Sequence, residues 1–135
     1  MIYIKAEIKG EPDVPVVSRV FEYSSKSDEI IFCNSVEIIK AKLARKLRIN
    51  TNETLTVYCA YIVDQMRSHR STKHIRNTSF KVLSTQNVMI GVPETLRKIK
   101  FEAIVDNLPK KKIVLEEPIP TSNYILASAP TKTNR

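Results

Sequence analysis

Apolar and polar residues alternate at the start of the chain. Positions 2, 4, 6 and 8 are apolar and the residues between them are polar, a period of two that predicts a half-buried strand. Further strands are expected over Val16–Tyr23 and Glu29–Cys33, which are separated by polar turn residues. A similar alternation at Ile99–Val105, followed by a turn and the run Lys112–Glu116, predicts a hairpin near the end of the chain.

A helix is predicted over residues 35–48. Asn34 can cap its start, with Glu37 three residues later as in a capping box. Apolar residues follow at spacings of three and four, which places them on one face of a helix. This stripe consists of Val36, Ile39, Leu43 and Leu47.

The run Thr54–Val63 is rich in β-branched and aromatic residues and is apolar on both alternating faces. It is therefore predicted to be a central strand of the sheet, and the alternative for its C-terminal end is the start of a helix that runs into Met66. Two more strands are expected at Ser79–Leu83 and Asn87–Val92, and a short helical turn after Pro93. Residues 64–78 have no clear apolar period, and an element near 64–76 is predicted to be either helix or loop.

These elements predict an α+β fold in which an antiparallel or mixed sheet packs against the helix at 35–48. A length of 135 residues suits one domain, placed at residues 1–119. The Pro-, Ser- and Thr-rich segment 120–135 is expected to be a flexible tail.

The run Val36-Glu-Ile-Ile-Lys-Ala-Lys-Leu43 resembles the helix of ubiquitin. Together with the strands expected before and after it, residues 1–63 resemble the first half of a ubiquitin-like β-grasp fold. This resemblance implies a protein-interaction module, either ubiquitin-like or PB1-like, that binds an acidic partner surface.

No pattern of residues indicates catalysis, and the chain is predicted not to be an enzyme and to need no cofactor or metal. Cys33 and Cys59 lie in apolar runs and are expected to be buried free thiols. His69 and His74 are five residues apart among cations, which does not suit a zinc site. With no signal peptide, lipidation motif or long apolar segment, the protein is expected to be intracellular, either cytoplasmic or nuclear.

The net charge of +8 is unevenly distributed. Residues 1–37 carry a net charge of −3, residues 38–100 carry +10, and residues 101–135 carry +1. A concentration of cations in the folded part of a chain attracts polyanions. The residues expected to contact phosphate groups are Lys42, Arg45, Lys46, Arg48, Arg67, Arg70, Lys73, Arg76, Arg97 and Lys98.

The leading functional hypothesis is therefore a non-catalytic protein that binds nucleic acid, RNA rather than a specific DNA site, through a basic face. A second hypothesis is a structural protein of the viral matrix type, which self-associates into an oligomer and docks on anionic membrane. The ubiquitin-like or PB1-like interaction module is the third.

Overall fold

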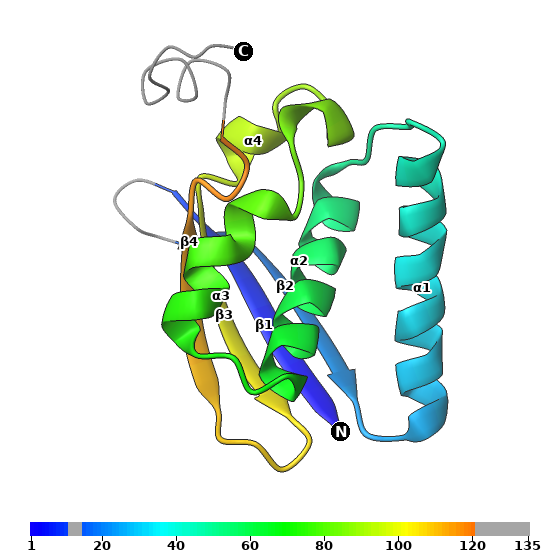
Figure 1. Ribbon diagram of the computed structural model, residues 1–135, viewed down its shortest axis with the longest axis vertical. Helices are drawn as coiled ribbons and strands as arrows, with labels where there is room; N and C mark the ends of the chain where they lie inside the picture. The colour runs from blue at the N-terminus through cyan, green and yellow to red at the C-terminus, as the bar shows by residue number, and fades with distance from the viewer. Residues whose placement is uncertain (11–14, 121–135) are drawn as a thin grey trace.

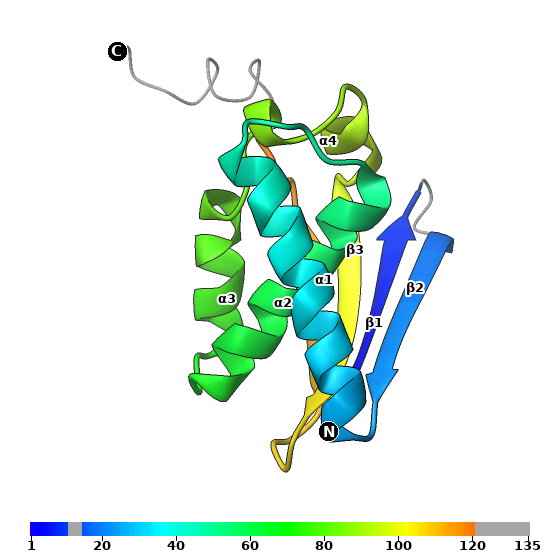
Figure 2. The same ribbon diagram turned by 90° about the vertical axis from the view of Figure 1, so that its right-hand side faces the viewer.

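The computed structural model describes residues 1–10 and 15–120 as two layers, a β-sheet and a layer of helices on one of its faces (Figures 1 and 2). The predicted α+β class is confirmed. The segment expected to be a tail lies outside the described residues except for Pro120, so the predicted domain boundary stays a prediction.

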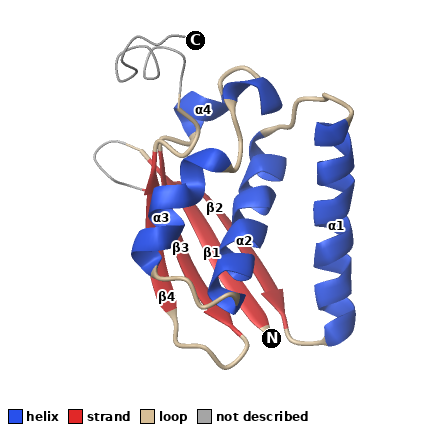
Figure 3. Ribbon diagram, in the orientation of Figure 1, coloured by secondary structure: helices blue, strands red, loops and turns tan. Residues whose placement is uncertain are grey.

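The sheet contains four antiparallel strands in the order β2-β1-β3-β4 (Figure 3). Their bounds are β1 Ile2–Lys9, β2 Pro15–Tyr23, β3 Lys98–Val105 and β4 Lys111–Glu116. Alternate residues of β1 and β3 are buried, so the period of two was interpreted correctly there. The chain thus begins with one hairpin and ends with another, and the two join where β1 pairs with β3.

Helix α1 (Lys26–Ala44) begins nine residues earlier than the predicted helix. Its cap is Ser25, whose side-chain oxygen accepts the Asp28 N–H at 3.2 Å, and not Asn34. The strand expected at Glu29–Cys33 is wrong, because these residues form the first turns of α1. The predicted apolar stripe lies on the side of α1 that faces the rest of the molecule, although Leu47 follows the helix and is exposed.

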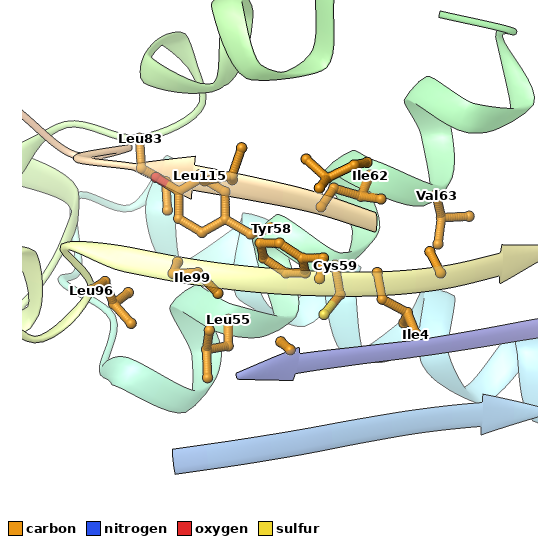
Figure 4. Close-up of a cluster of buried hydrophobic side chains, with 14 of the residues drawn as sticks. Ile4, Leu55, Tyr58, Cys59, Ile62, Val63, Leu83, Leu96, Ile99 and Leu115 are labelled. Atoms are coloured by element: carbon orange, nitrogen blue, oxygen red, sulfur yellow. The ribbon is translucent and has the colours of Figure 1, made fainter. Parts of the chain in front are cut away.

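Helix α2 (Thr51–Arg67) replaces the predicted central strand. Its buried apolar side chains fit a helical period and belong to the hydrophobic core, where Figure 4 shows five of them. The full set is Leu55, Tyr58, Cys59, Ile62, Val63 and Met66. The capping box predicted for α1 is found here instead. The Asn50 side chain accepts the Glu53 N–H at 2.8 Å, and the Glu53 carboxylate accepts the Asn50 N–H at 3.0 Å.

Short helical elements follow α2, and none of the strands expected between residues 79 and 92 forms. These elements are α3 (Thr72–Thr78), η1 (Ser79–Lys81), η2 (Thr85–Asn87) and α4 (Val92–Thr95). The helical turn predicted after Pro93 is confirmed as α4. Residues 64–67 belong to the end of α2 and residues 72–76 to α3, so the predicted helix-or-loop segment is mostly helical, with residues 68–71 as the connection.

The sheet does not have the predicted β-grasp arrangement. In that arrangement a strand follows the helix, but here α1 is followed by α2, which lies across the sheet (Figure 1). Helices α1 and α2 and the sheet enclose one hydrophobic core, centred on α2 and the inner faces of β1 and β3 (Figure 4). The ubiquitin-like resemblance of residues 1–63 is therefore wrong as a guide to the fold.

Candidate assembly surface

The described residues contain no cluster of three or more potential metal ligands. Cys59 is buried as expected, and burial raises the pKa of its thiol to about 12. Cys33 is exposed, contrary to prediction, because it lies on α1 and not on a buried strand. Cys59 is thus held as a neutral thiol and is unsuited to nucleophilic chemistry.

Arg67, predicted to contact phosphate, is instead the centre of an intramolecular ion network. Its guanidinium donates to both oxygens of Asp106 at 2.9 and 3.0 Å. It also donates to both oxygens of Glu29 at 3.0 and 3.2 Å. The hydrogen bonds from Arg67 are the main cause that lowers the pKa of each carboxyl group. Arg67 therefore joins the end of α2 to the start of α1 and to the turn between β3 and β4.

The other predicted basic residues fall into separate groups. Lys42 forms an ion pair with Glu53 of α2. Arg45, Lys46 and Arg48 are exposed in the connection from α1 to α2, where Lys46 adopts a φ of 65°. No ion pair from these three is found among the residues that the structure describes.

Arg70, Lys73 and Arg76 lie in and just before α3, beyond the opposite end of α2. A helix of 17 residues separates its two ends by roughly 24 Å. Arg97 directly precedes β3, and Lys98 is the first residue of that strand. Lys42 and the connection from α1 to α2 are near the first end of α2, so the structure does not unite the predicted cations on one compact surface.

The face of the sheet that carries no helix is balanced in charge. Lys5 lies opposite Glu102, and Glu7 lies opposite Lys100, so the cross-strand neighbours attract. Lys5 and Glu7 also approach to 3.4 Å. Such paired charges are typical of a sheet face that is exposed to solvent. The helical side is therefore the stronger candidate for a binding surface.

Helix α1 exposes large apolar side chains on its outer side. Ile31 and Ile38 are each 62% exposed and lie two helical turns apart on one side of α1, and Ile30 is 53% exposed. Only Phe32, Val36 and Ile39 of its 19 residues are both apolar and buried. A long helix at the edge of the molecule with so little of its apolar surface buried is typical of an interaction element (Figure 1).

Clefts run along both sides of α1. The larger, of about 420 Å³, lies between α1 and α2, with Val36, Leu43, Val57 and Tyr61 in its lining. The second, of about 270 Å³, lies between α1 and β2 beside the start of α2, and Ile38 is part of its lining. Its lining includes an aromatic cluster in which the Phe21, Tyr23 and Phe32 rings are 5.2 to 6.2 Å apart.

The Arg19 guanidinium lies over one ring of this cluster, 4.8 Å from the centre of the Phe21 ring. Aromatic and arginine side chains are the types enriched where proteins bind one another. We define the α1 surface as Ile30, Ile31 and Ile38 together with the adjoining cleft between α1 and β2. Its composition fits a protein partner.

Comparison with known proteins also supports a protein as the partner. Residues 23–119 match the model of the family "Urease, gamma subunit". The chain belongs to the urease gamma-subunit family. Over 83 residues, which are 62% of this chain and 82% of the relative, it is 32% identical to the urease subunit gamma of Halalkalibacterium halodurans.

Membership of the urease gamma-subunit family corrects the functional prediction. Nucleic-acid binding and the matrix-like alternative are both wrong, because this family consists of subunits of an enzyme complex. Nucleic acid and anionic membrane are accordingly wrong as partners, and the ubiquitin-like resemblance is wrong as a family assignment. The chain is similar to a subunit of an enzyme, and its own lack of catalytic activity stays a prediction.

Two further findings bear on the sequence predictions. Within the described ranges, every helix is too short or too polar to cross a membrane.

The α1 surface was missed because residues 29–33 were interpreted as a strand. The signal that could have revealed it is Ser25 followed by Asp28 and Glu29, a polar start typical of a helix that then carries Ile30 and Ile31.

Proposed function

We propose that this chain is a non-catalytic subunit of a urease-type complex and that the α1 surface binds another subunit. The observation that carries the proposal is the match over residues 23–119, which includes all of α1. The exposed isoleucines of α1 support it, because a complex gives these side chains a place to be buried.

The shape of the α1 surface also supports assembly. An apolar helix face beside a cleft with aromatic walls and an arginine provides a well-packed centre for an interface. The described residues offer no group of metal ligands, and burial holds the Cys59 thiol neutral. This supports a role in assembly and not in chemistry. An intracellular location remains part of the proposal.

Co-expression with the remaining urease subunits of the same organism tests the proposal. The mass of the purified complex is measured by size-exclusion chromatography with light scattering, and urease activity is measured with and without this chain. We expect the chain to co-purify in a fixed stoichiometry and to show no urease activity alone. Activity of the isolated chain would contradict its non-catalytic role.

The variant Ile31→Glu/Ile38→Glu tests the surface. Two buried glutamates at an interface cost far more than two exposed ones, so we expect the complex to be lost. Val20→Glu is the matched control, because Val20 is 50% exposed but lies on the helix-free face of the sheet. Equal assembly of both variants would exclude the α1 surface as the contact.

A further inference from the structure

Ile90 is displayed at the tip of a tight turn. Its side chain is 94% exposed, the highest value among the exposed large apolar residues of the described chain. The Val92 N–H donates to the Met89 carbonyl at 3.1 Å and closes the turn, and Gly91 adopts a φ of 93°. A positive φ at this position is one that glycine adopts without strain.

The segment that enters the turn is anchored to the core. Val88 forms a parallel bridge with Ile49, and both of these residues are buried. The Ile49 N–H donates to the Asn87 carbonyl at 3.0 Å, and the Met89 N–H donates to the Ile49 carbonyl at 2.9 Å. Ile90 is therefore held in place before any partner arrives, which reduces the entropy lost on binding.

Cations and further apolar side chains lie in the two segments that the Ile49–Val88 bridge joins. Leu47 and Met89 are 44% and 46% exposed. Because the bridge is parallel, residues 47 and 48 run in the same direction as residues 86 and 87, the segment that leads into the turn. Arg45, Lys46 and Arg48 flank Leu47 and make no ion pair with any described residue. Both views place the connection from α1 to α2 and the region of α4 at the same end of the molecule (Figures 1 and 2).

We infer that this end of the molecule is a second docking surface, at which Ile90 enters an apolar pocket with an acidic rim on another subunit of the complex. The Ile90 surface consists of Arg45, Lys46, Leu47, Arg48, Met89 and Ile90. The inference rests on the proposed function and adds a contact distinct from the α1 surface.

Charge identifies the occupant of the Ile90 surface. A second copy of the same surface would bring two sets of three unpaired cations together, which is unfavourable. A partner with carboxylates around its pocket would pair with them while burying the isoleucine. The exposed isoleucine at the same end of the molecule favours a protein as the source of these carboxylates.

Affinity measurements with the remaining urease subunits as the probe test the pocket. Ile90→Asp should weaken binding by tenfold or more, since burying an aliphatic side chain stabilises by more than the ~1.4 kcal/mol that equals a factor of ten. Val16→Asp is the matched control, because Val16 is 66% exposed on β2 and should leave the affinity unchanged. Thermal denaturation of each variant confirms that it is folded.

A pair of charge reversals tests the acidic rim. Arg45→Glu/Arg48→Glu should slow association and reduce the dependence of affinity on salt concentration. Arg70→Glu/Arg76→Glu makes the same change in net charge beyond the other end of α2 and should have a much smaller effect.

The outcomes separate this inference from the proposed function. If the wild-type chain does not bind the remaining urease subunits, both are overturned. If it binds, and Ile90→Asp binds as tightly as Val16→Asp, the Ile90 surface is overturned while assembly through α1 stands. If Ile90→Asp weakens binding but both charge reversals have equal effects, the acidic rim is overturned.

Discussion

Replacing Arg67 with methionine tests whether the ion network fixes α1 to the rest of the molecule. The methionine keeps an apolar stem of similar length but removes the four hydrogen bonds to Glu29 and Asp106. Because Glu29 lies in α1 and Asp106 in the turn after β3, the substitution disconnects three parts of the fold.

The expected loss follows from the geometry and the exposure of the network. A single exposed ion pair contributes about 0 to 1 kcal/mol, and paired hydrogen bonds in a network bring the value to the upper end of that range. The side chains of Arg67, Glu29 and Asp106 are 34%, 27% and 45% exposed, so water screens both pairs substantially. We expect Arg67→Met to lower the free energy of unfolding by about 1 to 2 kcal/mol at pH 7.

The dependence on pH distinguishes lost charge from lost packing. Hydrogen bonds from Arg67 hold the pKa of Glu29 and of Asp106 below its ordinary value. A lowered carboxyl pKa adds stability that is complete above the ordinary value near pH 4 and disappears as the pH falls through the lowered value. The difference between wild type and Arg67→Met should therefore be full at pH 7 and shrink as the pH falls below about 4.

Urea denaturation followed by circular dichroism at pH 7 and at pH 3 measures this difference. The triple variant Arg67→Met/Glu29→Gln/Asp106→Asn is the control, because it removes the charges without leaving two unpaired carboxylates. Equal midpoints for wild type and Arg67→Met at pH 7 would refute the reasoning. A difference that persists unchanged at pH 3 would refute the electrostatic part of it.

Further predictions concern individual features of the fold. Asn50→Ala removes the cap of α2 and should lower the free energy of unfolding by about 1 kcal/mol in urea denaturation. Lys46→Gly relieves a φ of 65° after α1 and should raise the thermal midpoint, with a gain of up to about 1 kcal/mol. Tyr58→Phe removes a buried hydroxyl with no hydrogen-bond partner among the described residues, so it should leave the free energy of unfolding unchanged or raise it. A decrease of more than about 1 kcal/mol would show that the hydroxyl has a hydrogen-bond partner. A thiol reagent should label Cys33 in the native protein and reach Cys59, whose pKa is about 12, only after unfolding.

The sheet could be predicted from the sequence where one face is buried and the other is polar. β1 and β3 meet this condition, and their alternation leaves a strand as the only reasonable interpretation. In α2, the residues outside the buried stripe include Val57, Ala60 and Tyr61, which pack partly against neighbouring elements. When most sides of a helix carry apolar residues, the sequence shows no helical period of apolar and polar positions. The β-branched and aromatic residues of α2 then favoured the prediction of a strand.

The candidate surfaces were harder to predict because they depend on which charges find partners. Arg67 and Arg48 are equivalent in a count of cations. In the structure, Arg67 binds two carboxylates from distant segments, whereas Arg48 makes no ion pair within the described chain. Only the folded arrangement separates a cation that stabilises the molecule from one that is available to a partner.

The hairpin of β1 and β2 lies mostly outside the segment that matches the family model, yet it belongs to the same folding unit. The family match begins at residue 23, after β1 and most of β2. Yet β1 is an inner strand that pairs with both β2 and β3, and its Ile2, Ile4 and Ile8 are buried in the core. Burying each such side chain contributes about 1.5 to 3 kcal/mol, so the three together are comparable with the 5 to 15 kcal/mol that typically stabilises a whole domain. The hairpin therefore holds α2 in place over the sheet. The α1 surface and the Ile90 surface both require the hairpin for their positions, although neither surface is centred on it.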